Sequence, residues 1–203
     1  MQTMIFKTKW GWVGLAATDR GVSAVVLPKP SRHAAECELM SDGLVTRVGA
    51  RRAVPLPAEV KTAACHLRAA RAAINAYLAG KARNFDLPLD WGDHSPFQVK
   101  VWAVLRSIPY GRVRSYGWVA RKIGKPRAAR AVGAACGANP VPLLVPCHRV
   151  VAGDGSLGGF SGGLPNKKRL LKLEGISLGR GASHGKRACP GRTAGWISAP
   201  TST

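Results

Sequence analysis

The chain has 203 residues, with 31 Lys and Arg against 10 Asp and Glu, so its formal net charge is +21 at pH 7. The length fits one large or two small domains, and 46% apolar residues suffice for a core, which excludes wholesale disorder. No stretch approaches the ~18 apolar residues of a membrane span, and residues 1–10 lack the apolar run of a secretory signal. We therefore expect a protein that stays inside the cell and has no membrane partner.

The positive charge is unevenly distributed along the chain. Residues 1–90 carry +6, residues 91–175 carry +11 and residues 176–203 carry +4. Nucleic acid is the polyanion that fits such a basic middle segment best. An anionic membrane surface is a weaker alternative, because no long helix is basic on one face and aromatic on the other. A role in solubility alone also stays open.

Residues 1–90 predict a small α/β unit that opens with a hairpin. Strands are expected over residues 10–16 and 22–27, and a tight turn at residues 18–21 joins them. The following residues, 29–57, are polar and are expected to be irregular.

A helix is expected over residues 58–79, with Gly80 as its C-terminal cap. Its apolar residues share one helical face: Val60, Leu67, Ile74 and Leu78. Residues 85–89 fit either an edge strand or a linker. We place the domain boundary near Trp91, because a strong helix start follows it.

That helix start is a capping box. Ser95 is a suitable N-cap, Pro96 occupies the first helical position, and Gln98 can return a hydrogen bond to the cap. The helix then has an apolar face: Phe97, Val101, Val104, Leu105 and Ile108.

Two further short helices about a Gly/Pro turn suggest a helix-turn-helix. Ser115 can cap the first, over residues 116–123, and the second is expected over about residues 127–138. The second helix is rich in Ala and Gly with Arg130 as its long projection, so it lacks the side chains that read base edges in the major groove. An Ala-rich core helix with a solvated Arg130 is the alternative.

The strongest chemical signal is the tetrapeptide Pro146-Cys147-His148-Arg149, which follows an apolar run bracketed by prolines. A thiolate is the reactive form of cysteine, and a neighbouring histidine that accepts its proton can generate it near neutral pH. Such a histidine usually needs a carboxylate to fix its tautomer. From residue 91 onward the available carboxylates are Asp93, Asp154 and Glu174. A structural cysteine beside a surface histidine would give the same local pattern.

The five cysteines are an odd number without a C-x-x-C pair, so they fit neither a disulfide framework nor a four-cysteine zinc site. Cys65 and Cys136 lie in predicted helices and are expected to pack in cores. The potential metal ligands of the N-terminal half have a spacing that matches no tight site: His33, Cys37, Cys65, His66 and His94. We expect no metal and no cofactor.

Eight sequence elements occur together in the C-terminal half: Phe97-Gln98 with Val101-Trp102, Ile108-Pro109-Tyr110-Gly111, Ser115-Tyr116, Ala129-Arg130-Ala131-Val132-Gly133, Asn139-Pro140, Pro146-Cys147-His148-Arg149-Val150, Gly158-Gly159-Phe160-Ser161-Gly162-Gly163-Leu164, and Lys167 with Leu170-Leu171 and Glu174. In order and spacing they resemble the O6-alkylguanine-DNA alkyltransferases, also called methylated-DNA-protein-cysteine methyltransferases. The resemblance covers residues 91–175 closely, whereas the preceding residues are merely compatible with the variable N-terminal domain of that family.

The resemblance implies direct-reversal DNA repair by an enzyme that acts once. Cys147 would accept the methyl or alkyl group from O6 of guanine, and from O4 of alkylated thymine, in an irreversible transfer. His148 would be the water-mediated base, Glu174 would orient it, and Asn139 would hold the active-site loop.

The resemblance also implies a set of DNA contacts. Tyr116 would rotate the target phosphate and assist protonation of the leaving guanine, and Arg130 would fill the gap left in the duplex. Ala131 and Gly133 would lie against the DNA. The flipped base would be bound by Tyr116, Val150 and Ser161.

At the level of fold, the resemblance implies a ribonuclease-H-like α/β domain over residues 1–90 and a mainly helical, winged-helix-like domain over residues 91–177. Residues 178–203 would be a flexible basic tail that either adds non-specific DNA affinity or is inert. The partner would be double-stranded DNA containing alkylated guanine. The protein would be a monomer of the cytoplasm, or of the nucleus in a eukaryote, and whether neighbouring molecules cluster cooperatively on DNA stays open.

Two other classes of protein remain as alternatives. A non-enzymatic reader of alkylated DNA would lack the reactive thiol, which Cys147 supplies. A cysteine hydrolase would need an oxyanion hole and a path for attacking water, neither of which the sequence reveals.

Overall fold

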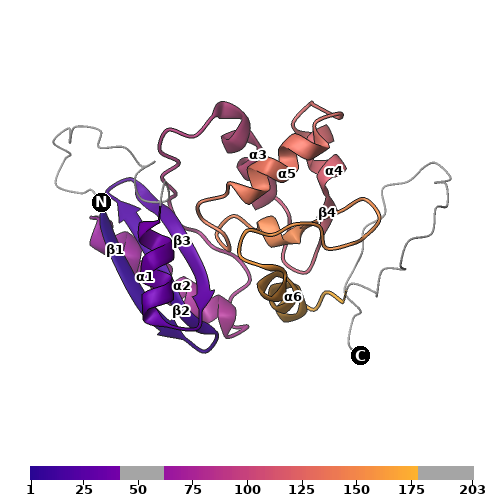
Figure 1. The fold of residues 1–203 in the computed structure, drawn as a ribbon. Helices are drawn as coiled ribbons and strands as arrows, with labels where there is room; N and C mark the ends of the chain where they lie inside the picture. Colours follow the sequence, from indigo (N-terminus) through magenta and orange to yellow (C-terminus); the bar gives the residue numbers. More distant parts are fainter. Residues whose placement is uncertain (42–61, 178–203) are drawn as a thin grey trace.

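The chain opens with a three-stranded antiparallel sheet (Figure 1). The structure, a computed structural model, describes residues 1–41 and 62–177. In spatial order the strands of this sheet are β1 (Gln2–Thr8), β2 (Gly11–Thr18) and β3 (Gly21–Lys29). The predicted hairpin is confirmed, because Thr18 pairs with Gly21 across a two-residue connection.

The sequence does not predict β1 as a separate strand, and this omission is an error. Along β1 only Phe6 and Thr8 are buried, because β1 is an edge of the sheet and one of its faces meets solvent. Its apolar residues are therefore too few to give a strong alternating pattern.

The expectation of an irregular stretch at residues 29–57 is wrong in part, because α1 (Arg32–Met40) forms there. The Ser31 hydroxyl caps this helix by accepting from the Ala34 backbone N–H (3.1 Å). The helix covers one face of the sheet in a small cluster: Ala16, Ala24, Val26, Ala35 and Leu39. Residues 42–57 lie outside the described residues.

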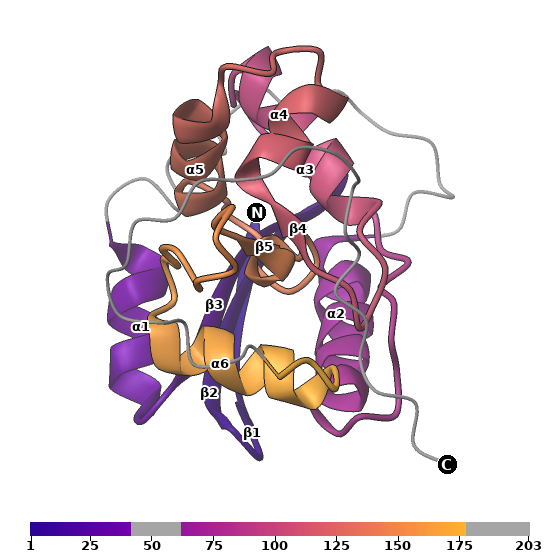
Figure 2. The same ribbon diagram turned by 90° about the vertical axis from the view of Figure 1, so that its right-hand side faces the viewer.

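The opposite face of the sheet is covered by α2 (Ala63–Leu78) (Figure 2). The predicted helix is confirmed over Ala63–Leu78, but Thr62 is its extended N-cap and not a helical residue; residues 58–61 lie outside the described part of the chain. Gly80, with φ +75°, follows its end as expected. Its buried side chains include Leu67, Ile74, Tyr77 and Leu78.

The second half of the chain is mainly helical. Its elements are α3 (Pro96–Arg106), β4 (Arg114–Ser115), α4 (Tyr116–Lys122), α5 (Ala129–Gly137), the 3₁₀ turn η1 (Cys147–Arg149), β5 (Val150–Val151) and α6 (Leu164–Leu173). The capping box of Ser95 and Gln98 at α3 is confirmed, as is the Ser115 cap of α4. Strands β4 and β5 pair in parallel, which brings the start of α4 beside the residues that follow η1. Within the two described ranges, no helix has the length and apolar character needed to cross a bilayer.

One hydrophobic core crosses the predicted domain boundary. It contains residues from the sheet, from α2 and from the C-terminal helices, among them Leu15, Leu27, Ile74, Trp102, Leu105, Val132 and Leu144. The Val25 backbone N–H of β3 donates to the Pro140 carbonyl oxygen (2.8 Å). Residues 85–89 form a linker beside β3, with one isolated bridge between Leu89 and Val22. The sheet therefore supports the loop that leads to the Cys-His pair.

The tight packing of this linker on the hairpin generates a stability prediction. Gly21 has φ +149°, and a Cβ there would lie 2.4 Å from the Pro88 carbonyl oxygen. We expect Gly21→Ala to lower the free energy of unfolding by about 3 kcal/mol, because the added methyl group must push backbone apart. Gly124→Ala is the matched control, since Gly124 also has positive φ (+77°) but faces open space; it should cost about 1 kcal/mol. Equal losses in urea denaturation would contradict this assignment.

Candidate active site

Asn139 fixes the loop that carries Cys147. Its side chain accepts from the Val141 backbone N–H (3.1 Å) and donates to the Val145 carbonyl oxygen (3.0 Å). Its Nδ2 atom also lies 3.2 Å from Cys147 Sγ. Within the loop Leu143 has φ +75°, which is uncommon for a residue with a side chain. One buried amide thus holds both the turn and the sulfur.

His148 is fully buried and faces Glu174. Its Nε2 lies 2.7 Å from Glu174 Oε1. Burial alone would raise the pKa of Glu174, but the hydrogen bond and charge of His148, together with Arg149, hold that pKa at about 2. An ionised carboxylate only accepts hydrogen bonds, so Nε2 carries the proton and Nδ1 is the basic nitrogen. Nδ1 has no hydrogen-bond partner among the described residues, so it is available to take a proton.

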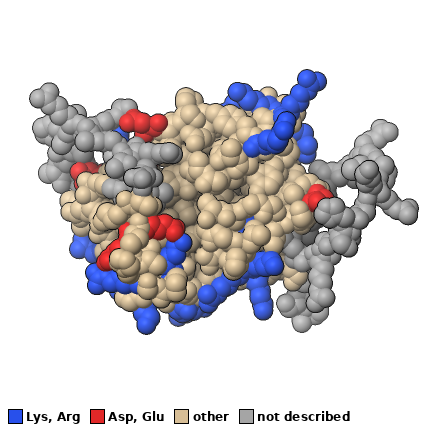
Figure 3. Space-filling model, viewed as in Figure 1, with Lys and Arg blue, Asp and Glu red and all other residues tan. Residues whose placement is uncertain are grey.

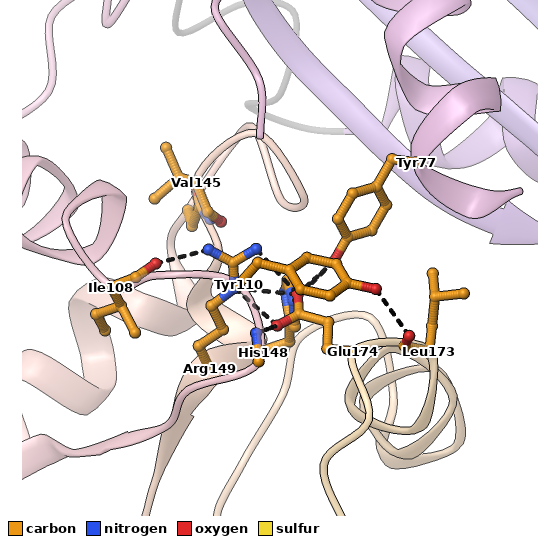
Figure 4. Close-up of polar contacts among 10 residues, drawn as sticks. Tyr77, Ile108, Tyr110, Val145, His148, Arg149, Leu173 and Glu174 are labelled. Carbon is orange, nitrogen blue, oxygen red and sulfur yellow. Dashed lines mark hydrogen bonds and ion pairs between the residues drawn. The ribbon is translucent and has the colours of Figure 1, made fainter. Parts of the chain in front are cut away.

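Further donors converge on the Glu174 carboxylate (Figure 4). Arg149 Nε lies 3.0 Å from Oε1 and 3.1 Å from Oε2, and its Nη1 donates to the Ile108 carbonyl oxygen (2.6 Å). The Gly111 backbone N–H donates to Oε2 (2.9 Å), and the Tyr77 hydroxyl donates to Oε1. The charge of this buried carboxylate is therefore balanced by groups from several elements, as a buried charge requires.

The thiol and the imidazole are both held in their neutral forms. Burial raises the pKa of Cys147, although hydrogen bonding from Asn139, the charge of Lys167 and nearby backbone N–H groups oppose this. Burial lowers the pKa of His148, although Glu174 opposes it. Near neutral pH the resting site is thus a thiol beside a neutral base, with groups in place that would stabilise a thiolate once it forms.

Lys167 organises the segment that borders the site. It is fully buried, and its Nζ donates to the carbonyl oxygens of Val150 (2.6 Å), Gly159 (3.3 Å) and Leu157. Burial lowers the pKa of Lys167 to about 8, while the nearby thiols favour its charged form. The three carbonyl contacts tie residues 150–159 into a fixed shape.

A pocket of about 720 Å³ opens onto Cys147 between α4, α5 and the segment that Lys167 holds. The Tyr116 hydroxyl donates to the Gly159 carbonyl oxygen (3.4 Å). The Tyr116 ring also lies so close to Gly158 that a Cβ there would be 3.0 Å from it. The lining includes Tyr116, Arg130, Gly133, Cys136, Cys147, Gly159 and Phe160. A planar ligand of the size of a base fits a pocket of this volume.

The structure brings most of the expected site residues together. Cys147, His148, Asn139 and Glu174 form one buried cluster, and Tyr116, Arg130 and Gly133 share the pocket with the thiol. Three others do not line that pocket. Val150 is buried and contributes its carbonyl to Lys167, whereas the side chains of Ala131 and Ser161 are exposed.

Exposed basic residues gather around the turn between α4 and α5. They are visible at the α4–α5 end of the molecule in Figure 3. Within residues 121–130, five of ten residues are basic, none is acidic and the basic ones are all exposed: Arg121, Lys122, Lys125, Arg127 and Arg130. This surface adjoins the pocket, because Arg121 and Arg130 also line it.

The sequence interpretation gives no role to Tyr77, Arg149 or Lys167, although all three contact the site. Arg149 and Lys167 appear in the matching sequence elements, and the burial of such long basic side chains is the signal that could have been sought. Tyr77 carries no such signal, because it lies 70 residues before Cys147 in a helix whose face reads as ordinary core.

Cys136 is buried, as the sequence predicts, and so is Cys147. Cys65 is partly exposed, so the prediction that it packs in a core is wrong. In the described ranges, no three His, Cys, Asp or Glu side chains are grouped so that they could hold a metal ion.

Comparisons with known proteins point to one family. The family model for the DNA-binding domain of 6-O-methylguanine DNA methyltransferase matches residues 96–176. The methylated-DNA–protein-cysteine methyltransferase of Mycolicibacterium paratuberculosis is 52% identical over 101 residues, which cover 50% of this chain and 61% of that protein. The corresponding protein of Methanosarcina barkeri is 44% identical over 124 residues, or 61% of this chain and 78% of that one. The chain thus spans about 61% of the length of the first of these relatives.

Solved structures give a match over most of the chain. The OGT of Mycobacterium tuberculosis in complex with DNA has a TM-score of 0.65 and 34% identity, and the match covers 86% of this chain and 92% of that one. The O6-methylguanine-DNA methyltransferase of Pyrococcus kodakaraensis has a TM-score of 0.63 and 29% identity, with coverage of 86% and 100%.

The mixed sheet-and-helix fold and the match over residues 96–176 place the chain in the 6-O-methylguanine DNA methyltransferase class. The chain belongs to the methylated-DNA–protein-cysteine methyltransferase family.

The environment of Glu174 generates a prediction about acid stability. Its pKa falls from an ordinary 4.5 to about 2 on folding, so its contribution is present above pH 4.5 and is lost as the pH falls toward 2. Between pH 5 and 3, the unfolding free energy of the parent should fall more steeply than that of Glu174→Gln, by about 2 kcal/mol over this range. Urea denaturation across this range is the measurement. Glu36→Gln, on the exposed face of α1, should keep the parent's slope, and an unchanged slope in Glu174→Gln would refute the assignment.

Proposed function

We propose that this chain repairs alkylated double-stranded DNA by moving the alkyl group from O6 of guanine, or from O4 of thymine, to Cys147. The observation that carries the proposal is the position of the Cys147 thiol. It is buried to 3% exposure at a pocket bordered by α4 and α5, and it adjoins a His148–Glu174 pair. DNA as the partner is supported by the complex of the M. tuberculosis protein with DNA.

The proposed chemistry follows from the geometry of the buried cluster. The Cys147 proton passes to His148 Nδ1, through a water molecule, while Glu174 accepts from Nε2 and balances the imidazolium that forms. Sγ then attacks the alkyl carbon, and a carbon–sulfur bond replaces the carbon–oxygen bond. The bonding electron pair leaves with the guanine, which takes up a proton from the Tyr116 hydroxyl at the pocket. Tyr116 regains a proton from solvent as the His148 imidazolium releases its own.

The target base must leave the DNA stack to reach a thiol at this depth, at a cost of a few kcal/mol that is lower for a damaged base. In the proposal α5 enters the minor groove, where Ala131 and Gly133 allow close approach to the backbone. Arg130, exposed at the pocket rim, occupies the space that the base vacates. Base-specific side chains would be a disadvantage here, because a lesion can occur in any sequence.

The thioether product explains why the proposed activity is limited to one turnover. A carbon–sulfur bond at a saturated carbon resists hydrolysis, so each molecule is consumed in its reaction. This stoichiometry separates the proposal from its two alternatives. A cysteine hydrolase would turn over repeatedly, and a non-enzymatic reader of damaged DNA would bind without acquiring the alkyl group.

The remaining features of the proposal concern organisation. Residues 1–90 would form a ribonuclease-H-like domain, and residues 91–177 would form a winged-helix-like domain that binds DNA through α4 and α5. Ser161 and the backbone near Val150 would contact the flipped base. Residues 178–203, which lie outside the described residues, would extend the basic surface. The protein would act as a monomer in the cytoplasm, or in the nucleus of a eukaryote.

The single-turnover proposal is tested with duplex DNA that carries a radiolabelled methyl group on guanine O6. Excess DNA should leave one label per chain, at Cys147, as peptide mapping would show. Cys147→Ser should acquire less than about 1% of that label, because a hydroxyl is a far weaker nucleophile than a thiolate. Cys37→Ser, which changes an exposed thiol on α1, should match the parent. Full labelling of Cys147→Ser, or several methyl groups removed per chain, would rule out the proposed function.

The base-extrusion step is tested with Arg130→Ala. Transfer from duplex DNA should slow by about 30-fold to 100-fold, because nothing then fills the gap in the stack. Transfer from the free base O6-benzylguanine requires no extrusion and should stay within about twofold of the parent. Arg32→Ala, on the far helix α1, controls for loss of one positive charge. Equal slowing with duplex and free base would show that Arg130 serves the pocket instead of the duplex.

A further inference from the structure

Tyr77 connects the N-terminal half of the chain to the catalytic cluster. It lies on α2, outside residues 96–176 that match the DNA-binding domain, and its side chain has no exposed surface. Its hydroxyl donates to Glu174 Oε1 and lies 3.3 Å from His148 Nε2 (Figure 4). The same carboxylate oxygen therefore accepts hydrogen bonds from both the imidazole of His148 and the hydroxyl of Tyr77.

We propose that Tyr77 is a positioning residue for the reaction, whose hydroxyl holds Glu174 ionised and sets the orientation of His148. This inference rests on the proposed function, in which His148 takes the proton of Cys147. In this proposal both α2 and the C-terminal half contribute residues to the catalytic site. Residues 96–176 alone therefore lack one of the groups that hold the proton acceptor His148 in place.

Packing alone does not account for the hydroxyl. The ring packs against Phe85 (centroids 4.9 Å apart) and edge-on against Tyr110 (6.0 Å), and a phenylalanine ring would fill the same space. A buried hydroxyl is costly without a partner. Its partner here is the carboxylate that orients the catalytic histidine. Burial and the adjacent Glu174 raise the pKa of Tyr77, so the phenol stays protonated and acts as a donor.

The electrostatic effect of this donor has a definite sign. The charged or titratable groups that influence His148 are Glu174, Arg149 and Lys167, with the Tyr77 hydroxyl against the same imidazole nitrogen. A donor on Oε1 neutralises part of the carboxylate charge that would otherwise attract the imidazolium. Removal of the hydroxyl should therefore raise the titration midpoint of His148, and it should also free the imidazole and the carboxylate to rotate.

The first test is Tyr77→Phe in the full chain. The rate constant for methyl transfer at saturating duplex DNA should fall about tenfold, as for loss of a hydrogen bond to a charged group, while the DNA dissociation constant stays within twofold. The His148 midpoint, read from imidazole nitrogen chemical shifts, should rise by about 0.5 pH unit. Tyr110→Phe is the matched control, since its ring packs against Tyr77 but its hydroxyl donates to the Leu173 carbonyl oxygen (2.8 Å) and not to Glu174; both quantities should match the parent.

Two further variants keep the test decisive. In a Glu174→Gln background the added Tyr77→Phe change should slow transfer by less than twofold, because Tyr77 acts through Glu174. If Tyr77→Phe folds poorly, 3-fluorotyrosine at position 77 retains the shape with a more acidic hydroxyl, and it should move the His148 midpoint downward. A Tyr77→Phe protein with the parent's rate and His148 midpoint, or a 3-fluorotyrosine protein with an unchanged midpoint, would overturn the proposal.

The two proposals can fail separately. Alkylation of Cys147 by iodoacetamide needs no DNA and depends on the same proton acceptor, so Tyr77→Phe should slow it about fivefold to tenfold. If the parent does not take methyl groups from DNA, the repair proposal fails, but this rate and the His148 midpoint still report on Tyr77. If the parent repairs DNA and neither quantity responds to Tyr77→Phe, only the role of Tyr77 is rejected.

Discussion

A carboxylate with 3% exposure can stay ionised only where donors replace the water that it has lost, and Glu174 is such a group. Its two oxygens accept from His148, Arg149, Tyr77 and the Gly111 backbone N–H. These donors come from η1, from α2 and from the turn after α3. The negative charge of Glu174 therefore connects elements that are far apart in sequence, and it simultaneously selects the His148 tautomer with a basic Nδ1. The ionised Glu174 carboxylate therefore contributes both to the packing of these elements and to the protonation state of His148.

The pocket beside Cys147 is joined to this buried ion through short contacts. Parallel pairing of β4 with β5 places the start of α4 beside the chain that follows Cys147. The Tyr116 ring packs on Gly158, where a Cβ would lie 3.0 Å from it. Lys167 holds the same segment through three carbonyl oxygens. The pocket walls are thus fixed before a ligand enters, which lowers the cost of ordering them on binding.

The features that the sequence predicts are those with local signals. The Ser95 capping box, the two helices around Gly124 and the Cys147–His148 pair all depend on residues within a few positions of each other. The residues alone leave three carboxylates as partners for His148, and only the family resemblance singles out Glu174. The contact of Tyr77 with Glu174 spans 97 residues, and no periodic pattern encodes it. The edge strand β1 and the alanine-containing helix α1 were missed for a different reason. Each buries too few large side chains to give a clear pattern, and their neighbours in the fold stabilise them.

The neutral state of the resting site bears on the proposed reaction, in which Cys147 would be used once. Burial shifts the pKa of Cys147 upward and that of His148 downward, so the thiolate–imidazolium pair is disfavoured until something compensates for its formation. Asn139, Lys167 and Glu174 are the groups that can stabilise this charged pair, and hydrogen bonds hold each of them in place. A base seated in the pocket displaces water and thereby strengthens the attraction between these groups and the forming charges. Proton transfer is then favoured by occupation of the pocket, so in the proposed reaction Cys147 reacts more slowly with small electrophiles in solution than with a base bound in the pocket.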